Sequence, residues 1–446
     1  MAAELAGYHA RVVSLVLHYR KTARHALNVL LGAVEAHPAT RDVPAVIAGS
    51  VDAVVDACHA AAAAGRRPVV AWSFWTAGFA GAVAELAEIR ARTAGVPTLH
   101  VAGGAHPSGD PGGTLRAGFD RVALGEGEET LPALLAAVSA GRDPRAVAGL
   151  AWLEGRAVRT SGRAASVDLD RVPGCAPRAG RLNPIEITRG CAWACRFCQT
   201  PFLFRARLRH RSIAAIREIV RTHVALQGRD LRFLTPSGLS YGAAGYGSDL
   251  DAVEALLAAV REEAGSSRRV SFGTFPSEFR PEHVTPRALG IVRRYCDNRA
   301  IIVGAQSGSD RMLAAMGRGH PAAAAERAVR HALEAGFTPE VDLVFGLPGE
   351  TEEDRAATRA QAVALAALGA RIHAHAFMPL PGTPWAGAAP GEIDPATRLV
   401  LDRLASAGRA HGGWRLQRAL ALGASGANGA NRSGPPKTPQ RRRVGT

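Results

Sequence analysis

Residues 184–201 read PIEITRGCAWACRFCQTP and place three cysteines, Cys191, Cys195 and Cys198, on one short stretch. The residues just before them alternate between apolar and polar side chains, which predicts a β-strand. Three thiols cannot pair as disulfides without leaving one over, so a reduced trio indicates a metal or cluster site. A four-iron cluster on three protein ligands keeps one iron open for chemistry.

Two other interpretations of the cysteines stay open at this point. A structural zinc loop needs a fourth nearby ligand, and the nearest candidate, His210, lies twelve residues beyond Cys198. Three ordinary buried thiols are the second alternative. The motifs that follow farther along the chain favour the cluster.

Length and composition predict a soluble protein of two or three domains. The chain has 446 residues, 47% of them hydrophobic, and no apolar run reaches the ~18 residues of a membrane span. Its N-terminus carries Glu4 and lacks the basic patch and apolar core of a signal peptide. We therefore expect a cytoplasmic location, where reducing conditions suit a thiolate-ligated cluster.

The net charge of +15 is only a weak indication of a nucleic-acid partner. Nearly all the basic residues are arginines, and a third of the excess lies in the acid-free stretch 423–446. This stretch is rich in Gly, Ser, Asn and Pro, which predicts a disordered basic tail. Such a tail is either solvated or in contact with a polyanion.

Residues 1–140 alternate short apolar runs with amphipathic stretches. Strands are expected at 11–18, 43–49, 68–74, 98–103 and 121–124, and helices at 23–36, 51–64, 79–94 and 128–140. Buried apolar strands that alternate with helices predict a doubly wound, Rossmann-like parallel sheet. Ligands of such sheets bind at the carboxyl ends of the strands.

The rest of the chain is predicted to form a connector, a second α/β domain and a helical end. The connector, 141–182, contains a hairpin at 150–159, and the second domain spans 183–388. Its expected strands are 231–235, 269–274, 300–304, 340–345 and 371–377, and its expected helices are 212–227, 249–264, 286–295, 321–335 and 352–368. With the strand before the cysteines, these make six β/α units. A C-terminal helical segment, 389–422, holds one helix at 395–421, and the tail follows.

Several motifs occur in order along the second domain. They are C-x3-C-x2-C with Phe197 before the last cysteine, GAQSGS at 304–309, VDLVFGLPGET at 341–351 and MPLPGTP at 378–384. Together they resemble the radical S-adenosylmethionine (SAM) superfamily. The resemblance implies a partial, TIM-type (β/α)6 barrel with its active site at the strand ends. It also implies that the three cysteines hold a 4Fe-4S cluster and that SAM lies along Phe197, Gln306, Ser309 and Gly346.

One departure from the family concerns the SAM amino group. The family commonly has a Gly-Gly-Glu segment after its second strand, whereas this chain has Thr235-Pro236-Ser237-Gly238. The hydroxyls of Thr235 and Ser237 are candidate acceptors, but a neutral group holds an ammonium less firmly than a carboxylate does. Glu278, from another strand, is a candidate substitute.

The stretch 103–135, GGAHPSGDPGGTLRAGFDRVALGEGEETLPALL, resembles the cobalamin-binding domain that precedes many radical SAM cores. The matching positions are Ser73, Gly103, Gly104, Gly125 and Gly127. The lower-ligand motif of that family, D-x-H-x-x-G, is missing after the first strand, although relatives without it also hold cobalamin. The alternative is a degenerate domain kept for packing or substrate contact.

The resemblance implies an enzyme that cleaves SAM to methionine and a 5′-deoxyadenosyl radical, fed by a flavodoxin- or ferredoxin-like electron donor. With cobalamin present, methyl transfer to a small-molecule substrate is favoured. No residue is identified as the catalytic acid, base or radical relay; His18, His25 and Tyr241 lie at strand ends, where such residues are more often structural. The alternatives are a cobalamin-independent enzyme that modifies RNA and a non-enzymatic iron–sulfur protein that binds polyanions.

The basic run 202–212, FLFRARLRHRS, leaves three interpretations open: a solvated loop, counter-charge for the cluster, or a site for an anionic substrate. It also resembles the corresponding run of the tRNA methylthiotransferases. Those enzymes bind a second cluster through three N-terminal cysteines and end in a β-rich RNA-binding domain. The N-terminal third of this chain has Cys58 alone, and the chain ends in a predicted helix and tail. We therefore do not expect that subfamily.

Overall fold

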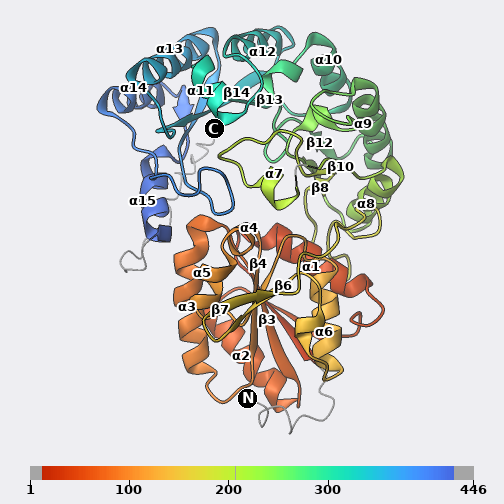
Figure 1. The fold of residues 1–446 in the computed structure, drawn as a ribbon. Helices are drawn as coiled ribbons and strands as arrows, with labels where there is room; N and C mark the ends of the chain where they lie inside the picture. Colours follow the sequence, from red (N-terminus) through yellow and green to blue (C-terminus); the bar gives the residue numbers. More distant parts are fainter. Residues whose placement is uncertain (1–12, 206, 426–446) are drawn as a thin grey trace, which may run out of the picture.

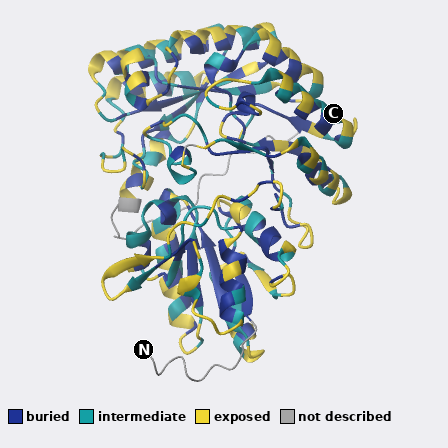
Figure 2. Ribbon diagram, turned by 45° about the vertical axis from the view of Figure 1, so that its right-hand side comes forward, coloured by how far each residue is buried: buried dark blue, intermediate teal, exposed yellow. Residues whose placement is uncertain are grey.

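The computed structural model describes residues 13–205 and 207–425. The chain folds into two lobes, each a mainly parallel sheet covered by helices, which lie one above the other in Figure 1. The central strands are buried and the outer faces of the helices are exposed (Figure 2). None of the described helices is long and apolar enough to cross a membrane.

The N-terminal lobe contains a seven-stranded sheet in the order β2-β1-β3-β4-β5-β6-β7. Its strands are β1 (Val13–His18), β2 (Ala45–Ala48), β3 (Arg67–Ser73), β4 (Leu99–Gly103), β5 (Arg121–Ala123), β6 (Leu150–Glu154) and β7 (Ala157–Thr160). Its helices are α1 (Arg24–Ala36), α2 (Val51–Ala63), α3 (Phe79–Arg92), α4 (Ala105–Gly109), α5 (Pro111–Arg116) and α6 (Thr130–Ser139), with 3-10 turns η1 (Thr76–Gly78) and η2 (Pro144–Ala146).

Strands β1 to β5 are parallel, and helices cover both faces of their sheet, so two apolar cores form on opposite sides. Every residue of β1 is buried, as expected for a strand covered on both faces. The predicted doubly wound sheet is confirmed. The hairpin expected in the connector instead pairs with β5 and extends this sheet. Helices α4 and α5 were not expected, because their sequence is rich in Gly and Pro.

The C-terminal lobe is a partial barrel of parallel strands. They are β8 (Ile185–Glu186), β11 (Asp230–Leu234), β12 (Arg269–Ser271), β13 (Ala300–Gln306), β14 (Thr338–Phe345), β15 (Arg371–Ala376) and β16 (Ala410–His411). The helices are α7 (Thr200–Leu203), α8 (Ile213–Ala225), α9 (Leu250–Ala264), α10 (Pro286–Tyr295), α11 (Asp310–Met316), α12 (Ala323–Glu334), α13 (Glu352–Leu368), α14 (Pro395–Ser406) and α15 (Trp414–Ser425). A short antiparallel pair, β9 (Thr188–Arg189) and β10 (Arg209–His210), and the turns η3 (Gly238–Ser240) and η4 (Pro281–His283) complete it.

The six predicted β/α units are present in the expected order. The strands form two groups, β12-β11-β8 and β13-β14-β15-β16, joined by a parallel bridge between Phe279 and Val303. Their order in space follows their order in the chain, as in a barrel that is wound progressively. The predicted barrel class is confirmed.

The prediction of a single C-terminal helix at 395–421 is wrong. The chain forms α14, then β16, which pairs with β15, and then α15. Gly408 and Gly412 have φ values of +70° and +132°, which a continuous helix cannot contain. Helix α15 reaches the other lobe, where it contacts η1 and α3 (Figure 1). Most of the predicted tail, from residue 426 on, lies outside the described residues.

Candidate active site and interdomain cavity

The three cysteines lie on a loop whose base is closed by the β9–β10 pair. Gly190, at the start of the loop, has a φ of +84°, and a Cβ there would lie 1.7 Å from the carbonyl oxygen of Arg207. The position therefore requires glycine, because no side chain fits against that backbone. All three cysteines are free and line one cavity of about 250 Å³. Burial raises the pKa of Cys191 to about 11, so its thiol is protonated at neutral pH unless a metal ion replaces the proton.

The cavity opens at the carboxyl ends of the barrel strands, where barrels of this type place their active sites. Besides the cysteines, its lining contains Trp193, Phe197, Thr200, Pro201, Pro236, Ser237, Glu278, Phe279, Arg280, Gly304, Gln306, Arg318 and Asp342. Three predicted SAM-site residues, Phe197, Ser237 and Gln306, are thus brought together with the cysteines. Their contact with SAM stays a prediction.

The structure does not bring Thr235, Ser309 and Gly346 into this lining. The Thr235 hydroxyl donates to the carbonyl of Ser237 at 3.2 Å, and the Ser309 hydroxyl donates to Asp354 at 2.5 Å. At Gly346, whose φ is +71°, a Cβ would lie 2.7 Å from the backbone nitrogen of Glu392. All three have structural roles here, and their roles toward SAM stay predictions.

Two arginines beside the cysteines were not identified from the sequence. Arg318 Nη1 donates to Cys195 Sγ at 3.7 Å and Nη2 donates to the Gly304 carbonyl at 2.5 Å. The Arg280 guanidinium lies 3.7 Å from the centroid of the Trp193 ring. Both cations can offset the negative charge of ligating thiolates. The run Met-Gly-Arg-Gly-His at 316–320, which begins at the end of α11, was the available signal for Arg318. It does not reveal the direction of the side chain.

Glu278 is the candidate carboxylate for holding the SAM amino group, because the Thr-Pro-Ser-Gly segment supplies none. It lines the cysteine cavity and forms no ion pair with any residue that the structure describes. Burial raises its pKa to about 7. A partly buried carboxyl group that forms no ion pair favours binding of a cation, because the cation stabilises its ionised form.

Two arginines of the basic run 202–212 have structural roles. Arg209 forms an ion pair with Glu126 of the other lobe, with Nη1 donating to Oε2 at 3.1 Å. Arg211 is almost fully buried and donates to the carbonyls of Leu169 and Val172. For these two arginines the solvated-loop interpretation is wrong, and neither lines the cysteine cavity. The sequence could not show this, because their partners lie about 40 to 80 residues away.

A second cavity, of about 330 Å³, lies between the lobes. It lies at the carboxyl ends of β3, β4 and β5, and its lining includes all five residues predicted for cobalamin, Ser73, Gly103, Gly104, Gly125 and Gly127. The barrel lobe contributes Glu186, Arg189, Leu203, Phe204 and Leu234. The structure therefore brings these five positions together at one cavity; their contact with cobalamin stays a prediction.

One edge of the interdomain cavity carries a buried ionic network centred on Arg189. Its Nη2 donates to Glu128 at 2.6 Å and to Glu186 at 2.7 Å, and its Nη1 donates to Glu126 at 3.2 Å. Arg189 and Glu186 belong to the barrel lobe, whereas Glu126 and Glu128 follow β5 of the N-terminal lobe. The network therefore joins the two lobes beside the cavity.

His18, His25 and Tyr241 were left without a role by the sequence. One of them lines a cavity and the other two make structural contacts. His25 lines the interdomain cavity, and its Nδ1 lies 3.1 Å from Asn183 Oδ1. His18 stacks on Trp72, with ring centroids 3.8 Å apart. The Tyr241 hydroxyl donates to the Arg211 carbonyl at 2.8 Å.

Comparisons with known proteins agree with the motifs. The model of the radical SAM superfamily matches residues 185–362. The chain is 26% identical over 350 residues to an uncharacterized protein of Methanopyrus kandleri, covering 66% of this chain and 64% of that protein. It is 30% identical over 181 residues to tRNA-2-methylthio-N(6)-dimethylallyladenosine synthase of Saccharophagus degradans, covering 39% of this chain and 37% of that enzyme. The chain thus spans less than two thirds of the length of both relatives.

Two solved structures share the fold across both lobes. TsrM from Kitasatospora setae, a radical SAM methyltransferase solved with cobalamin and a 4Fe-4S cluster, has a TM-score of 0.65 at 21% identity, covering 84% of this chain and 74% of its own. OxsB, a cobalamin-dependent SAM radical enzyme solved with aqua-cobalamin, has a TM-score of 0.61 at 13% identity, covering 81% and 52%. Identities this low establish a shared fold. In agreement with the ordered motifs, residues 185–362 of this chain match the radical SAM superfamily model.

Proposed function

We propose that the protein is a radical SAM enzyme that also binds cobalamin and transfers a methyl group to a small-molecule substrate. The observation that carries this proposal is the pair of cavities, one lined by the three cysteines and the other by the glycine-rich strand ends of the adjoining lobe. Both lie where ligands of parallel α/β folds bind. The shared fold with TsrM and OxsB, which bind cobalamin, supports the pairing.

The residues of the interdomain cavity fit a large, flat ligand. Gly104 has a φ of +96°, and a Cβ there would lie 2.9 Å from Ser73 Oγ. A Cβ at Gly127 would lie 2.8 Å from a methyl carbon of Leu30. Glycine is required at these two positions by contacts with the protein itself, and the mostly apolar remainder of the lining suits the face of a large ring. Burial lowers the pKa of His25, so the histidine in this lining is neutral at neutral pH.

The residues of the cysteine cavity fit a cluster and SAM. When bound, the cluster supplies the electron that cleaves SAM, and cobalamin supplies a carrier for the methyl group. Phe197 offers an apolar wall, Ser237 and Gln306 offer hydrogen bonds, and Arg280 and Arg318 offset negative charge. Glu278 is our candidate for accepting hydrogen bonds from the ammonium group of SAM, and a flavodoxin- or ferredoxin-like protein is the expected electron donor.

The proposal is tested by two measurements on one preparation. Anaerobically reconstituted protein should cleave SAM when reduced, and protein from cells grown with cobalamin should carry corrinoid absorbance. Absence of SAM cleavage would remove the enzyme interpretation. Cleavage without corrinoid would favour a cobalamin-independent enzyme.

A methyl group added at Gly103 tests whether cobalamin occupies the interdomain cavity. A Cβ at Gly103 meets no protein atom closer than 3.7 Å, so Gly103→Ala should fold normally. If cobalamin lies against this backbone, the variant should retain several-fold less corrinoid than the wild type after gel filtration, because the methyl group occupies ligand space. Gly49→Ala is the matched control, since its Cβ would meet nothing within 4 Å and it does not line the cavity. Equal corrinoid in both variants would contradict the placement.

Glu278→Gln is expected to weaken SAM binding by roughly 10- to 100-fold, the value of a hydrogen bond to a charged group. The reason is the loss of the carboxylate that faces the ammonium group. Equilibrium dialysis of labelled SAM under anaerobic conditions measures the effect. Glu278→Asp should keep most of the affinity because it keeps the charge, and an unchanged affinity in Glu278→Gln would show that the ammonium binds elsewhere.

An RNA substrate is the alternative, and the likeness to a tRNA-modifying synthase favours it. Arg209 and Arg211 do not support it, because Arg209 is paired with Glu126 and Arg211 donates to buried backbone carbonyls. Salt-sensitive RNA binding by protein that lacks residues 423–446 would favour the RNA alternative over the small-molecule substrate.

A further inference from the structure

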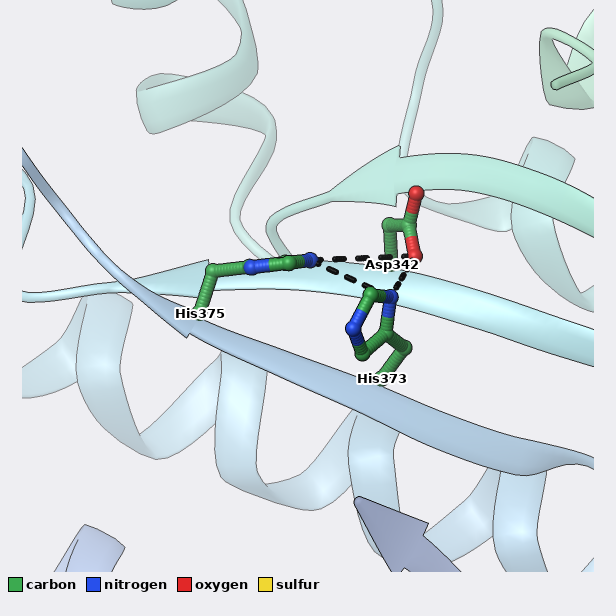
Figure 3. A group of neighbouring side chains, drawn as sticks. All are labelled: Asp342, His373 and His375. Atoms are coloured by element: carbon green, nitrogen blue, oxygen red, sulfur yellow. Dashed lines mark hydrogen bonds and ion pairs between the residues drawn. The ribbon is translucent and has the colours of Figure 1, made fainter. Parts of the chain in front are cut away.

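Asp342, His373 and His375 form a cluster of side chains that the proposed function does not use. Asp342 is on β14, and the two histidines are on β15. Asp342 pairs with His373 across the parallel ladder, and residues two apart on a strand point to the same face, which brings His375 beside them. Figure 3 shows all three side chains pointing toward one another from these two strands.

The distances between their ligand atoms suit one metal ion. His373 Nδ1 lies 2.8 Å from Asp342 Oδ1, His375 Nε2 lies 3.2 Å from His373 Nδ1, and His375 Nε2 lies 3.9 Å from Asp342 Oδ1. Ligand atoms about 2.1 Å from one ion are roughly 3.0–3.5 Å from one another in octahedral or tetrahedral geometry. The three measured distances bracket this range, so small side-chain rotations place all three atoms around one centre.

The hydrogen bonds around the histidines leave the cluster short of acceptors. Asp342 accepts from His373 Nδ1, which places a proton there. Gln417 Oε1 accepts from the Ala376 amide at 2.7 Å, so its Nε2 faces His375 Nδ1 at 3.2 Å and places the proton of that ring on Nε2. Two N–H groups then meet between the rings, which is unfavourable. A cation held by both nitrogens and the carboxylate removes this conflict.

We propose that Asp342, His373 and His375 bind one divalent transition-metal ion, such as Zn²⁺, at a site separate from the cysteine loop. Two imidazoles and one carboxylate suit zinc or another first-row ion, whereas Mg²⁺ and Ca²⁺ prefer oxygen ligands alone. Three protein ligands leave a position open, as in catalytic zinc sites.

The position of the site indicates what the open coordination position is for. Asp342 also lines the cysteine cavity, so the ion is held at the wall of that cavity. The open position binds an oxygen or nitrogen atom of the substrate and orients it there. This substrate role rests on the proposed function, whereas metal binding itself does not.

Neighbouring residues hold the histidines in place. The His411 ring, on β16, stacks on His373 with centroids 4.7 Å apart and an interplanar angle of 11°. Gln417, on α15, fixes the His375 ring through Nδ1. When Nε2 binds a metal ion, the remaining proton moves to Nδ1, where the Gln417 amide nitrogen is itself a donor and does not accept it, whereas a carboxylate at this position does.

The test measures zinc binding by the full-length protein with its cluster reconstituted. Binding is measured by equilibrium dialysis and elemental analysis, without SAM or reductant. The wild type should bind one Zn²⁺ per chain beyond the cluster. Asp342→Asn, His373→Gln and His375→Gln should each bind it at least tenfold more weakly, with iron content and circular dichroism reporting that the fold is intact. Equal zinc binding in wild type and all three variants overturns the proposal.

Two further variants separate ligation from packing. His411→Gln should keep zinc affinity within about threefold, because His411 stacks on the site and supplies no ligand. Gln417→Glu should bind zinc about tenfold more tightly, the usual size of such an effect from a group that supports a histidine ligand. Unchanged affinity in Gln417→Glu would overturn ligation through His375 Nε2. Zinc binding and SAM cleavage are measured separately, so failure of one leaves the other result standing.

Discussion

Replacing Arg189 with methionine is expected to lower the free energy of unfolding by about 3–5 kcal/mol, the cost of breaking a buried ion pair from one side. Its side chain is 7% exposed and holds three carboxylates, those of Glu126, Glu128 and Glu186, whose side chains are 7%, 5% and 11% exposed. Methionine keeps much of the volume and removes all the positive charge. The carboxylates are then left with Arg209 as their one ion-pair partner within the described chain.

The measurement is chemical unfolding of wild type and variant at neutral pH. Arg330→Met is the control, because Arg330 pairs with Glu326 on an exposed helix face, where both side chains are about half exposed. An exposed pair of this kind contributes less than about 1 kcal/mol. If Arg189→Met lowers the free energy of unfolding no more than Arg330→Met does, the network does not hold the lobes together. Because Glu126 and Glu128 come from the other lobe, we also expect the Arg189 variant to lose corrinoid more readily.

Strands and helices could be predicted from the sequence because both lobes repeat one local pattern. Apolar strands covered on both faces, as in β1, and amphipathic helices between them produce a signal that each segment carries alone. The errors occurred where a contact distant in sequence decides the structure. β16 exists because two residues pair with β15, and the hairpin β6–β7 joins the N-terminal sheet because it pairs with β5. Nothing local in 410–411 or 150–160 indicates either partner.

The same distinction holds for the candidate sites. The cysteines, Phe197, Ser237 and Gln306 could be predicted to lie together because each ends or follows a strand, and the ends of parallel strands meet at one edge. Arg280 and Arg318 required knowledge of side-chain direction. The cluster of Asp342, His373 and His375 required the register of β14 against β15, although the alternating His-Ala-His of β15 was a visible signal that both histidines share a face.

Replacing Cys198 with alanine is expected to abolish reductive SAM cleavage and to reduce cluster iron from about four atoms per chain to nearly none, because two cysteines do not hold a four-iron cluster. Iron analysis, the visible absorbance of the cluster and the yield of 5′-deoxyadenosine after reduction measure the effect. The same result is expected for Cys191→Ala and Cys195→Ala, since all three line one cavity.

Cys58→Ala and Cys175→Ala are the matched controls for the cysteine loop. Both residues are buried, and burial raises the pKa of each thiol to about 11. Neither lines the cysteine cavity. A protonated, buried thiol is inert, so these variants should keep iron and SAM cleavage close to wild-type levels. Loss of iron in either control would show that stability of the fold governs cluster retention. Zinc in place of iron in the anaerobically purified wild type would instead favour a structural metal loop. Full iron loss confined to the three loop variants assigns the ligands, because all five positions carry free thiols and only the three loop positions line the cavity.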